Sequence, residues 1–495
     1  MIVNFFCKNR KLFFFLLLAA LTLSTLFSAA LAQQMQSIPA EKISFERIFK
    51  PQTTERLIVE DVNEKLYTAK GCKIIHRLED ALSIECPVSA AIPNAIKDTK
   101  LHMQNVDLPK SFKPSDVPNN DYLHIPQAWS QGYTGKNRIV AVVDTGVDYN
   151  HPSLSNHILM KKSFVSYTED AMDDVGHGTA IAGIITGDGN PEMEYCSDGC
   201  ETVPEDFSKG VAPDAKLMVA KVCGPDGCDV ADIAAGIEWA VAGYDKVEDC
   251  FGKCGYSITC CKKYDGCSAV KINSKYTCTG TYVENVKPDV ISLSLGSTAT
   301  WINSNCDKGK KISWENYIAK KIDWAVKKGV PVVVATGNMM YGVASPACAG
   351  KAIAAGGLDW FVFDNKNYDA VWQTCYGVLC TGSGRGFAMK DHGVLAPWVA
   401  FSTVPGGYGL IAGTSVSAPH VAGLIALMKE KNPKLTAEQV RQTIFKTSIP
   451  LNSQQVCYGD YCFTVAAFQA EDELYEEGHG KIDAATALSA VRQAS

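Results

Sequence analysis

The sequence lacks the features that mark nucleic-acid-binding and disordered proteins. Its 495 residues carry a formal net charge of -6, and no run of basic residues follows the first dozen positions. A chain of this charge is not expected to bind nucleic acid electrostatically. Charged residues make up 20% and hydrophobic residues 46%, which excludes an intrinsically disordered chain. Internal repeats and Asn-x-Ser/Thr sequons are also absent, so N-glycosylation is not expected.

Long apolar runs are absent as well, except at the N-terminus. Three basic residues precede the apolar stretch 12–31, which ends in a small-residue Ala-x-Ala motif before Gln33. This pattern indicates a secretory signal peptide over residues 1–32 and therefore an extracellular protein. An uncleaved membrane anchor is the alternative, because about 20 apolar residues span a bilayer. No later segment is long and apolar enough, so we expect no membrane association after signal removal.

Cysteine, in contrast, is plentiful, with 19 residues. Export favours disulfides over free thiols. Cys7 lies in the signal, and Cys72 and Cys86 precede the motifs below, which leaves 16 cysteines, an even number that can pair completely. The sequence does not fix the connectivity, but four close pairs could close short loops: Cys196/Cys200, Cys223/Cys228, Cys375/Cys380 and Cys457/Cys462.

Six further cysteines crowd an insertion at about residues 245–285, namely Cys250, Cys254, Cys260, Cys261, Cys267 and Cys278. A thiolate metal site is one interpretation. An oxidising destination, the adjacent Cys260 and Cys261 and the absence of a nearby histidine favour disulfides instead. The insertion is then either a stapled loop or the interaction surface of a disulfide-rich extracellular binding protein.

The residues before about position 110 read as a small α+β unit over 33–110. Short alternating segments at 73–78 and 81–86 predict strands, and a helix is predicted around 89–97. A Pro-rich, polar stretch follows and resembles an exposed linker, so we expect proteolytic cleavage between Leu108 and Pro118.

Residues 111–495 alternate short Val- and Ile-rich runs with helical patterns. The expected strands are 138–143, 217–222, 290–295, 330–335 and 353–356. The expected helices are 178–185, 230–241, 314–328, 416–431 and 437–446. The alternation predicts an α/β fold with a doubly wound, mainly parallel sheet and helices on both faces. Such sheets place their sites beyond the carboxyl ends of the strands.

Four polar residues lie at the ends of these elements. Asp144 and Asn338 follow predicted strands, and His177 and Ser415 immediately precede predicted helices. Singly, each could be only a cap or a turn residue. Together they converge on one edge of the sheet, and the backbone N–H of Ser415 would face developing negative charge. The order Asp, His, Ser is that of subtilisin.

The chain resembles the subtilase family of serine endopeptidases from Gly135 to Leu488. The motifs that carry the resemblance are VAVVDTGVDYNHPSL, GHGTAIAGII, GVAPDAKLMVAKV, ISLSLGS, VVVATGN, LAPW, GTSVSAPHVAGLIALM and GHGKIDAATAL. The resemblance implies a subtilisin-like fold and hydrolysis of protein or peptide substrates through an acyl-enzyme.

The resemblance also implies a role for each polar residue. Ser415 would attack the scissile carbonyl, His177 would carry the proton, and Asp144 would orient His177. Asn338 and the backbone N–H of Ser415 would stabilise the oxyanion. Two segments would flank an extended substrate and pair with its backbone, unless they are ordinary core strands: Ser294, Leu295, Gly296 and Ala335, Thr336, Gly337.

Residues 33–110 resemble an inhibitory, fold-assisting propeptide, which implies an autoprocessed zymogen and, we expect, a monomer. Catalysis would need no cofactor. A structural calcium ion is possible but doubtful, because Ser153 stands where calcium-binding members usually have Asp and the segment after Ile185 is lengthened. A second acidic set could bind calcium or simply form a solvated loop: Asp188, Glu192, Glu194 and Asp198.

Two other functions compete with this interpretation. A pseudoprotease would bind peptides without cutting them, but all four polar residues are intact. A convertase that cleaves after paired basic residues is disfavoured, because no acidic pocket can be assigned. For the protease, activity should fall as His177 is protonated, near or somewhat below pH 6.5.

Overall fold

The computed structural model describes residues 53–103, 114, 117, 120–197, 199–263, 267–272, 275–298, 300–301, 304–308, 313–339, 342–363, 366–371, 373–376, 379–384, 386–450, 454–458, 461–465 and 478–493. The predicted signal peptide and most of the predicted linker lie outside these residues. Among the helices described, none has the length and apolarity needed to cross a bilayer.

A mainly parallel sheet organises the larger part of the chain. Its order is β21-β20-β18-β16-β6-β10-β7, with β24 also paired to β20. Only the β20–β21 pair is antiparallel among the strand pairs described for this sheet. The strands are β6 (Ile139–Asp144), β7 (Ile158–Ser163), β10 (Lys216–Lys221), β16 (Val290–Leu293), β18 (Val332–Ala335), β20 (Ile353–Phe363), β21 (Lys366–Val371) and β24 (Gly393–Pro397).

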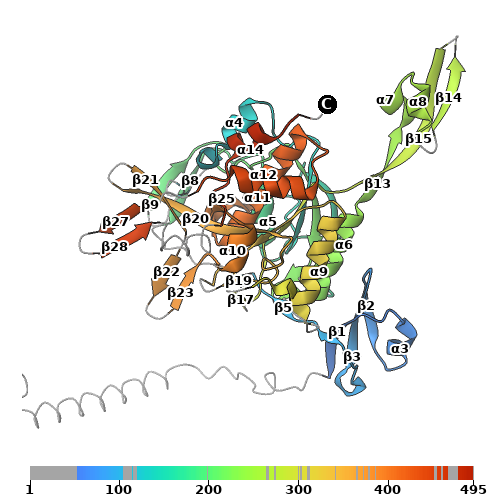
Figure 1. Ribbon diagram of the computed structural model, residues 1–495, viewed down its shortest axis with the longest axis horizontal. Coiled ribbons are helices and arrows are strands. Elements are labelled where there is room, and N and C mark those ends of the chain that lie inside the picture. Colours follow the sequence, from blue (N-terminus) through green and yellow to red (C-terminus); the bar gives the residue numbers. More distant parts are fainter. Residues whose placement is uncertain are drawn as a thin grey trace, which may run out of the picture. The chain divides into compact units, whose positions relative to one another are not determined.

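Helices cover both faces of this sheet (Figure 1). One face carries α4 (Ile125–Ser130), α5 (His177–Thr186), α11 (Thr414–Lys431), α12 (Ala437–Thr447) and α14 (Ala484–Ala490). The other carries α6 (Val230–Ala242) and α9 (Trp314–Lys327). A short helix, α10 (Phe387–His392), contacts β20 and β24. The expected doubly wound α/β fold is confirmed, and the five predicted helices begin and end within two residues of their expected bounds.

Strand β6 explains why the central strands read as unbroken apolar runs. All six of its residues are buried. Val140 and Val142 pack into the core beneath α5 and α11, whereas Ala141 and Val143 pack into the core beneath α6 and α9. Because both faces of a parallel sheet are covered, successive side chains are apolar instead of alternating with polar ones.

A smaller sheet precedes the large one in the chain, in the order β2-β3-β1-β4. Its core contains Leu57, Tyr67 and Ile84, together with the Cys72–Cys86 disulfide. The elements are β1 (Thr54–Val59), α3 (Glu64–Thr68), β2 (Lys73–Arg77), β3 (Leu82–Pro87) and β4 (Ile96–Lys97).

The helix predicted around 89–97 is wrong. That stretch contains only a 3₁₀ turn, η2 (Val88–Ala90), and strand β4. Pro93 lacks the N–H that a helix interior requires, and Ala91 and Asn94 adopt positive φ angles of 45° and 57°. The helix of this unit is α3 instead.

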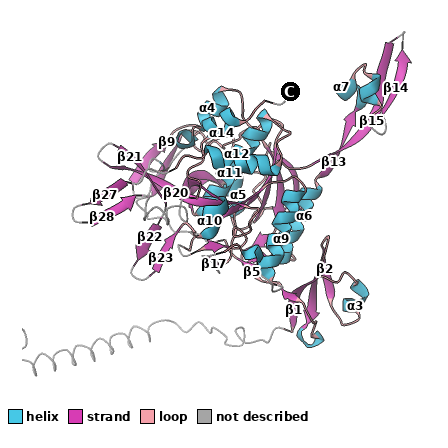
Figure 2. Ribbon diagram, viewed as in Figure 1, coloured by secondary structure: helices cyan, strands magenta, loops and turns pink. Residues whose placement is uncertain are grey.

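The insertion, residues 244–286, forms a cysteine-rich arm whose strands pair with one another (Figure 2). All six of its cysteines form disulfides: Cys250–Cys267, Cys254–Cys260 and Cys261–Cys278. The sulfurs of Cys250, Cys267 and Cys278 lie within 4.8 Å of one another, but each already bonds a sulfur and is no thiolate ligand. The arm contains β13 (Tyr244–Asp249), α7 (Cys250–Cys254), α8 (Ile258–Cys261), β14 (Cys267–Ile272) and β15 (Lys275–Val286).

Most of the remaining strands described form short hairpins, whereas β17 pairs with β19 and β5 pairs with β12 across long stretches of chain. Disulfides Cys196–Cys200 and Cys223–Cys228 close two of the four predicted short loops, and Cys306–Cys348 links a longer one. Backbone pairing sets Cys375 opposite Cys380 and Cys457 opposite Cys462. The strands are β5 (Lys100–Leu101), β8 (Met193–Ser197), β9 (Gly199–Val203), β11 (Cys223–Gly224), β12 (Gly227–Asp229), β17 (Thr300–Trp301), β19 (Val343–Ala344), β22 (Gln373–Tyr376), β23 (Leu379–Gly382), β25 (Val399–Val404), β26 (Gly407–Ala412), β27 (Gln454–Tyr458) and β28 (Tyr461–Val465).

Candidate active site

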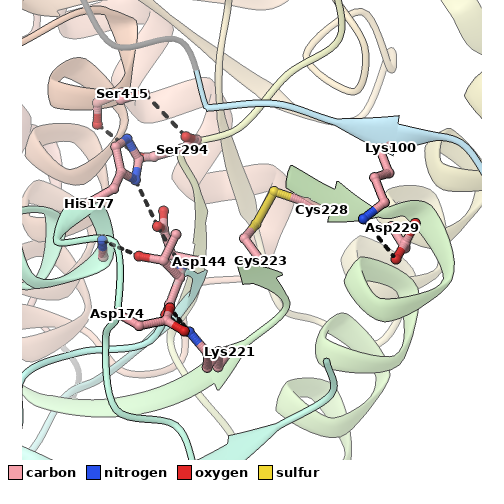
Figure 3. The surroundings of a disulfide bond; sticks show 12 residues. Lys100, Asp144, Asp174, His177, Lys221, Cys223, Cys228, Asp229, Ser294 and Ser415 are labelled. Atoms are coloured by element: carbon pink, nitrogen blue, oxygen red, sulfur yellow. Dashed lines mark hydrogen bonds and ion pairs between the residues drawn. A yellow bond between two sulfur atoms is a disulfide. The ribbon is translucent and has the colours of Figure 1, made fainter. Parts of the chain in front are cut away.

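Asp144 and His177 meet at the carboxyl edge of the large sheet. Asp144 is the last residue of β6 and His177 the first of α5. His177 Nδ1 lies 2.7 Å from Asp144 Oδ1, which also accepts a hydrogen bond from Thr145 N at 2.7 Å. In Figure 3, Ser415, His177 and Asp144 follow one another in a row. The histidine is therefore held through one nitrogen by a buried carboxylate.

Small and polar residues around the start of α5 make this contact possible. A Cβ atom at Gly178 would lie 2.0 Å from the carbonyl oxygen of Gly146, so only glycine lets α5 approach the end of β6. Asp173 accepts hydrogen bonds from the backbone N–H groups of Gly176 and Thr179 and from the Thr179 hydroxyl. Asp173 thus fixes the turn that presents His177.

The protonation of His177 depends on two opposing effects. Burial favours the neutral ring, but the charge and hydrogen bond of Asp144, with a contribution from Asp173, outweigh burial and raise the pKa of His177 above 6.5. The other ring nitrogen, Nε2, is buried and makes no hydrogen bond to the described residues. It is the atom that can exchange a proton with a bound molecule.

Ser415 is the second residue of α11 and is 7% exposed. Its N–H is among the first four of the helix, which have no partner one turn earlier. Its hydroxyl donates a long hydrogen bond of 3.2 Å to the carbonyl oxygen of Ser294, and the Ser294 hydroxyl donates to the Ser415 carbonyl at 2.9 Å. The start of α11 is thereby fixed against the end of β16.

Asn338 follows β18 and reaches the same helix end. Its Oδ1 accepts hydrogen bonds from the backbone N–H and the hydroxyl of Thr414, at 2.9 and 3.0 Å. A Cβ atom at Gly413, whose φ is +123°, would lie 2.8 Å from Asn338 Nδ2. Glycine therefore lets the amide lie against the start of α11, and all four predicted polar residues meet at one edge.

Sequence reasoning assigned no role to a fifth residue, Lys221, at the end of β10, although it lies in the motif GVAPDAKLMVAKV. Its side chain is fully buried, and its ammonium donates to the Thr145 carbonyl and to Asp174, both at 2.6 Å. The only signal in the sequence is a lysine ending an apolar run. The contact braces the residue after Asp144.

A segment of the chain itself lies along the Ser294–Gly296 edge. His102 N donates to the Gly296 carbonyl at 3.1 Å in an antiparallel bridge. On its other side, β5 pairs antiparallel with β12, which sets Leu101 opposite Cys228. The segment thus lies between two backbone edges, as an added strand does. The sequence gave no sign of β12, although Cys223 and Cys228 flank a Gly-Pro-Asp-Gly turn.

The second predicted substrate edge is engaged differently. Ala335 pairs with β20 inside the large sheet, and Thr336 N donates to Ala355 O. Gly337 N donates to the Thr414 hydroxyl, and Gly337 O accepts from Gly384 N. These backbone groups are used within the fold, so the role of this segment in substrate binding stays a prediction.

The acidic set proposed as a second calcium site is described only in part, because Asp198 lies outside the described residues. Asp188 lies 2.9 Å from Nε2 of His157, and Ser153 stands at the position that carries Asp in calcium-binding members. Among the described residues, the three disulfide cysteines above are the sole group of potential metal-binding side chains found together.

Comparison with known proteins agrees with this geometry. The model of the subtilase family matches residues 135–480. The major intracellular serine protease of Bacillus subtilis is 27% identical over 72% of this chain and 90% of its own length. Subtilisin Savinase of Lederbergia lenta is 30% identical over 68% of this chain and 92% of its own, and a subtilisin of Bacillus sp. (strain TA39) is 28% identical over 77% and 75%. The chain belongs to the subtilase family and is a serine endopeptidase.

Proposed function

We propose that Ser415, His177, Asp144 and Asn338 carry the peptidase reaction. His177 Nε2 removes the proton of the Ser415 hydroxyl as the oxygen attacks the scissile carbonyl. Asp144 holds the ring through Nδ1 and stabilises the imidazolium. The imidazolium then protonates the leaving amine, and a water molecule, activated in the same way, releases the acyl group from Ser415.

The oxyanion of the tetrahedral intermediate lies at the start of α11. Asn338 Nδ2 and the Ser415 N–H are its proposed donors, aided by the helix dipole. The observation that carries the mechanism is His177, held by Asp144 on one nitrogen and with no hydrogen bond to the described residues on the other. A pseudoprotease would have no need to leave that buried nitrogen unpaired.

We propose further that residues 33–110 are an inhibitory prodomain and that the chain is a secreted, autoprocessed zymogen. The support is the segment Lys100–His102, which occupies the edge along which a substrate would lie. In addition to this segment, salt bridges between Arg56 and Asp232 and between Asp80 and Lys321 join the proposed prodomain to α6 and α9. Cleavage between Leu108 and Pro118 remains a prediction, as do removal of residues 1–32 and a monomeric state.

The test compares the full chain with its Ser415→Ala variant under oxidising conditions. We expect only the wild-type chain to shorten by self-cleavage and to take one label from a serine-reactive phosphonate. The Asn338→Ala variant should mature slowly, and its kcat should fall by about 10²–10³, the usual cost of removing an oxyanion donor. Equal masses and no label in both chains would instead support the pseudoprotease.

A further inference from the structure

The start of α6 carries two carboxylates that face cations of the prodomain. Arg56 Nη1 lies 2.8 Å from Asp229 Oδ2, and Arg56 Nη2 lies 2.6 Å from Asp232 Oδ1. His76 Nε2 lies 2.7 Å from the same Asp232 oxygen. The two aspartates are three residues apart, so one helix turn presents both to one side.

Lys100 approaches the same carboxylates from the segment that occupies the substrate edge. Its ammonium lies 3.9 Å from Asp229 Oδ2, and the backbone register sets Lys100 directly opposite Asp229 (Figure 3). The side chain of Lys100 is 46% exposed and that of Asp229 is 13% exposed. The chain therefore already holds a cationic side chain, on an extended segment, against Asp229, the first of the two acids.

The register fixes where that cation lies relative to the reacting bond. His102 pairs with Gly296, and Ser294, two residues earlier on that edge, contacts Ser415. In an antiparallel pairing, a peptide residue two positions after the place of His102 lies opposite Ser294. Lys100 therefore occupies the place four residues before the one whose carbonyl Ser415 would attack.

Loss of the prodomain leaves the two aspartates without their cations. Arg56, His76 and Lys100 leave with it, as does Asp98, which caps α6 through Ala231 N at 3.0 Å and contacts Arg56. Burial, partly offset by Arg56, raises the pKa of Asp229 in the precursor. Loss of this cover would remove the burial that raises this pKa, and the positive end of α6 favours the ionised carboxylate.

We propose that Asp229 and Asp232 then form a subsite for a Lys or Arg side chain of the substrate, four residues before the one attacked. The inference rests on the proposed function and adds a substrate class to it. The prodomain would block this subsite with its own cations, and substrates would replace them. The preference lies far from the scissile bond and is distinct from cleavage after paired basic residues.

The test uses three peptides that copy residues 97–108, with Lys, Gln or Glu at position 100. Mature wild-type enzyme should cut the Lys peptide with a kcat/KM about three- to tenfold above that of the Gln peptide, and the Glu peptide should be poorest. The preference should shrink at about 0.5 M salt, because screening weakens accessible ion pairs. Mass spectrometry should locate the cut after Gln104; the same register in the precursor would put self-cleavage ahead of the Leu108–Pro118 range.

Matched variants assign the preference to its residues. Asp229→Asn should bring the Lys-to-Gln ratio close to one. Asp226→Asn, an exposed acid in the turn of the same hairpin, should leave the ratio unchanged. If Asp229→Asn fails to mature, the three peptides and the salt series on wild-type enzyme still decide the question.

The outcomes separate the subsite from the proposed function. Equal kcat/KM for the three peptides, with cutting that requires Ser415, overturns the subsite and leaves the peptidase mechanism intact. If the enzyme cuts denatured protein but not the peptides, or cuts the peptides at another bond, the proposed register of the substrate on the Ser294–Gly296 edge is wrong. Absence of any cutting by mature wild-type enzyme overturns the proposed function itself.

Discussion

Two lysines with almost completely buried side chains, Lys221 and Lys321, have different structural roles. Lys221 bonds Thr145 and Asp174, both within the region that carries the site. Lys321, on α9, bonds Glu238 on α6 and also Asp80 in the turn between β2 and β3. The first lysine braces one part of the structure, whereas the second joins two parts that the proposed zymogen would have to separate.

The exposure of their partners shows how the second contact can break. The Asp80 side chain is 60% exposed, so water already competes for its charge. If the proposed prodomain is removed, Lys321 should gain water on the face that Asp80 occupies and keep Glu238. Lys221 is 0% exposed and has no such relief, because the residues around it stay in place. Whether the contact of a buried lysine can be broken therefore depends on whether its partner lies in the same part of the chain or in the part proposed to be removed.

The strongest test of this difference is Lys221→Met. It leaves Asp174 without its cation and the Thr145 carbonyl without a donor, so we expect a loss of about 2–4 kcal/mol in the free energy of unfolding. Urea unfolding in a Ser415→Ala background measures this without self-digestion. Lys136→Met, at an exposed lysine, should cost less than about 0.5 kcal/mol. Equal losses for the two variants would contradict the bracing role.

Lys321→Met should act on the prodomain instead of on catalysis. Loss of one shared cation should speed prodomain release about tenfold, seen as a shorter lag before activity, while the kcat/KM of the mature enzyme stays the same. Lys320→Met is the matched control, because its ion pair with Glu60 is long, at 3.7 Å, and both side chains are more than half exposed. A fall in mature kcat/KM would place Lys321 in the catalytic structure.

The dependence of kcat/KM on pH should be the same in the wild-type and Lys321→Met enzymes. We expect this effect to be smaller than those of the two lysine substitutions. Only neutral His177 can accept the serine proton, so a raised pKa means that kcat/KM rises with pH through a midpoint above 6.5. This replaces the sequence-based expectation of a midpoint near or somewhat below that value. Measured kcat/KM between about pH 5 and 9 checks it. A midpoint below 6.5 would mean that burial outweighs Asp144.

Local sequence patterns were enough to predict most of the fold and the four polar residues. The helices start at capping or small residues and follow apolar periodicity, and the strands are apolar because both faces are covered. Strand β7 was missed because its burial alternates and two of its residues are lysines, Lys161 and Lys162, as at a half-exposed edge. The pattern of an edge strand is weaker than that of a central one.

Contacts between distant residues could not be predicted. Lys221 reads as the polar end of an apolar run until Thr145 and Asp174 surround its ammonium. Strand β12 gains its role only because Lys100, 129 residues earlier, pairs with Asp229. Both depend on how the chain returns to the same edge, which neither composition nor periodicity records.

The cysteine-rich arm should show the smallest effect of all. Cys250, Cys254, Cys261 and Cys278 form a core of their own, apart from the two cores around the large sheet. Replacing residues 250–278 with a short Gly-Ser turn should therefore change stability by less than about 1 kcal/mol and peptide kcat/KM by less than about twofold. By contrast, the double variant Cys223→Ser, Cys228→Ser should have a raised KM. It lacks the Cys223–Cys228 disulfide, which holds the strand that pairs with Lys100. Normal cleavage of peptides with slower cleavage of large proteins would favour the exosite interpretation of the arm over a stapled loop.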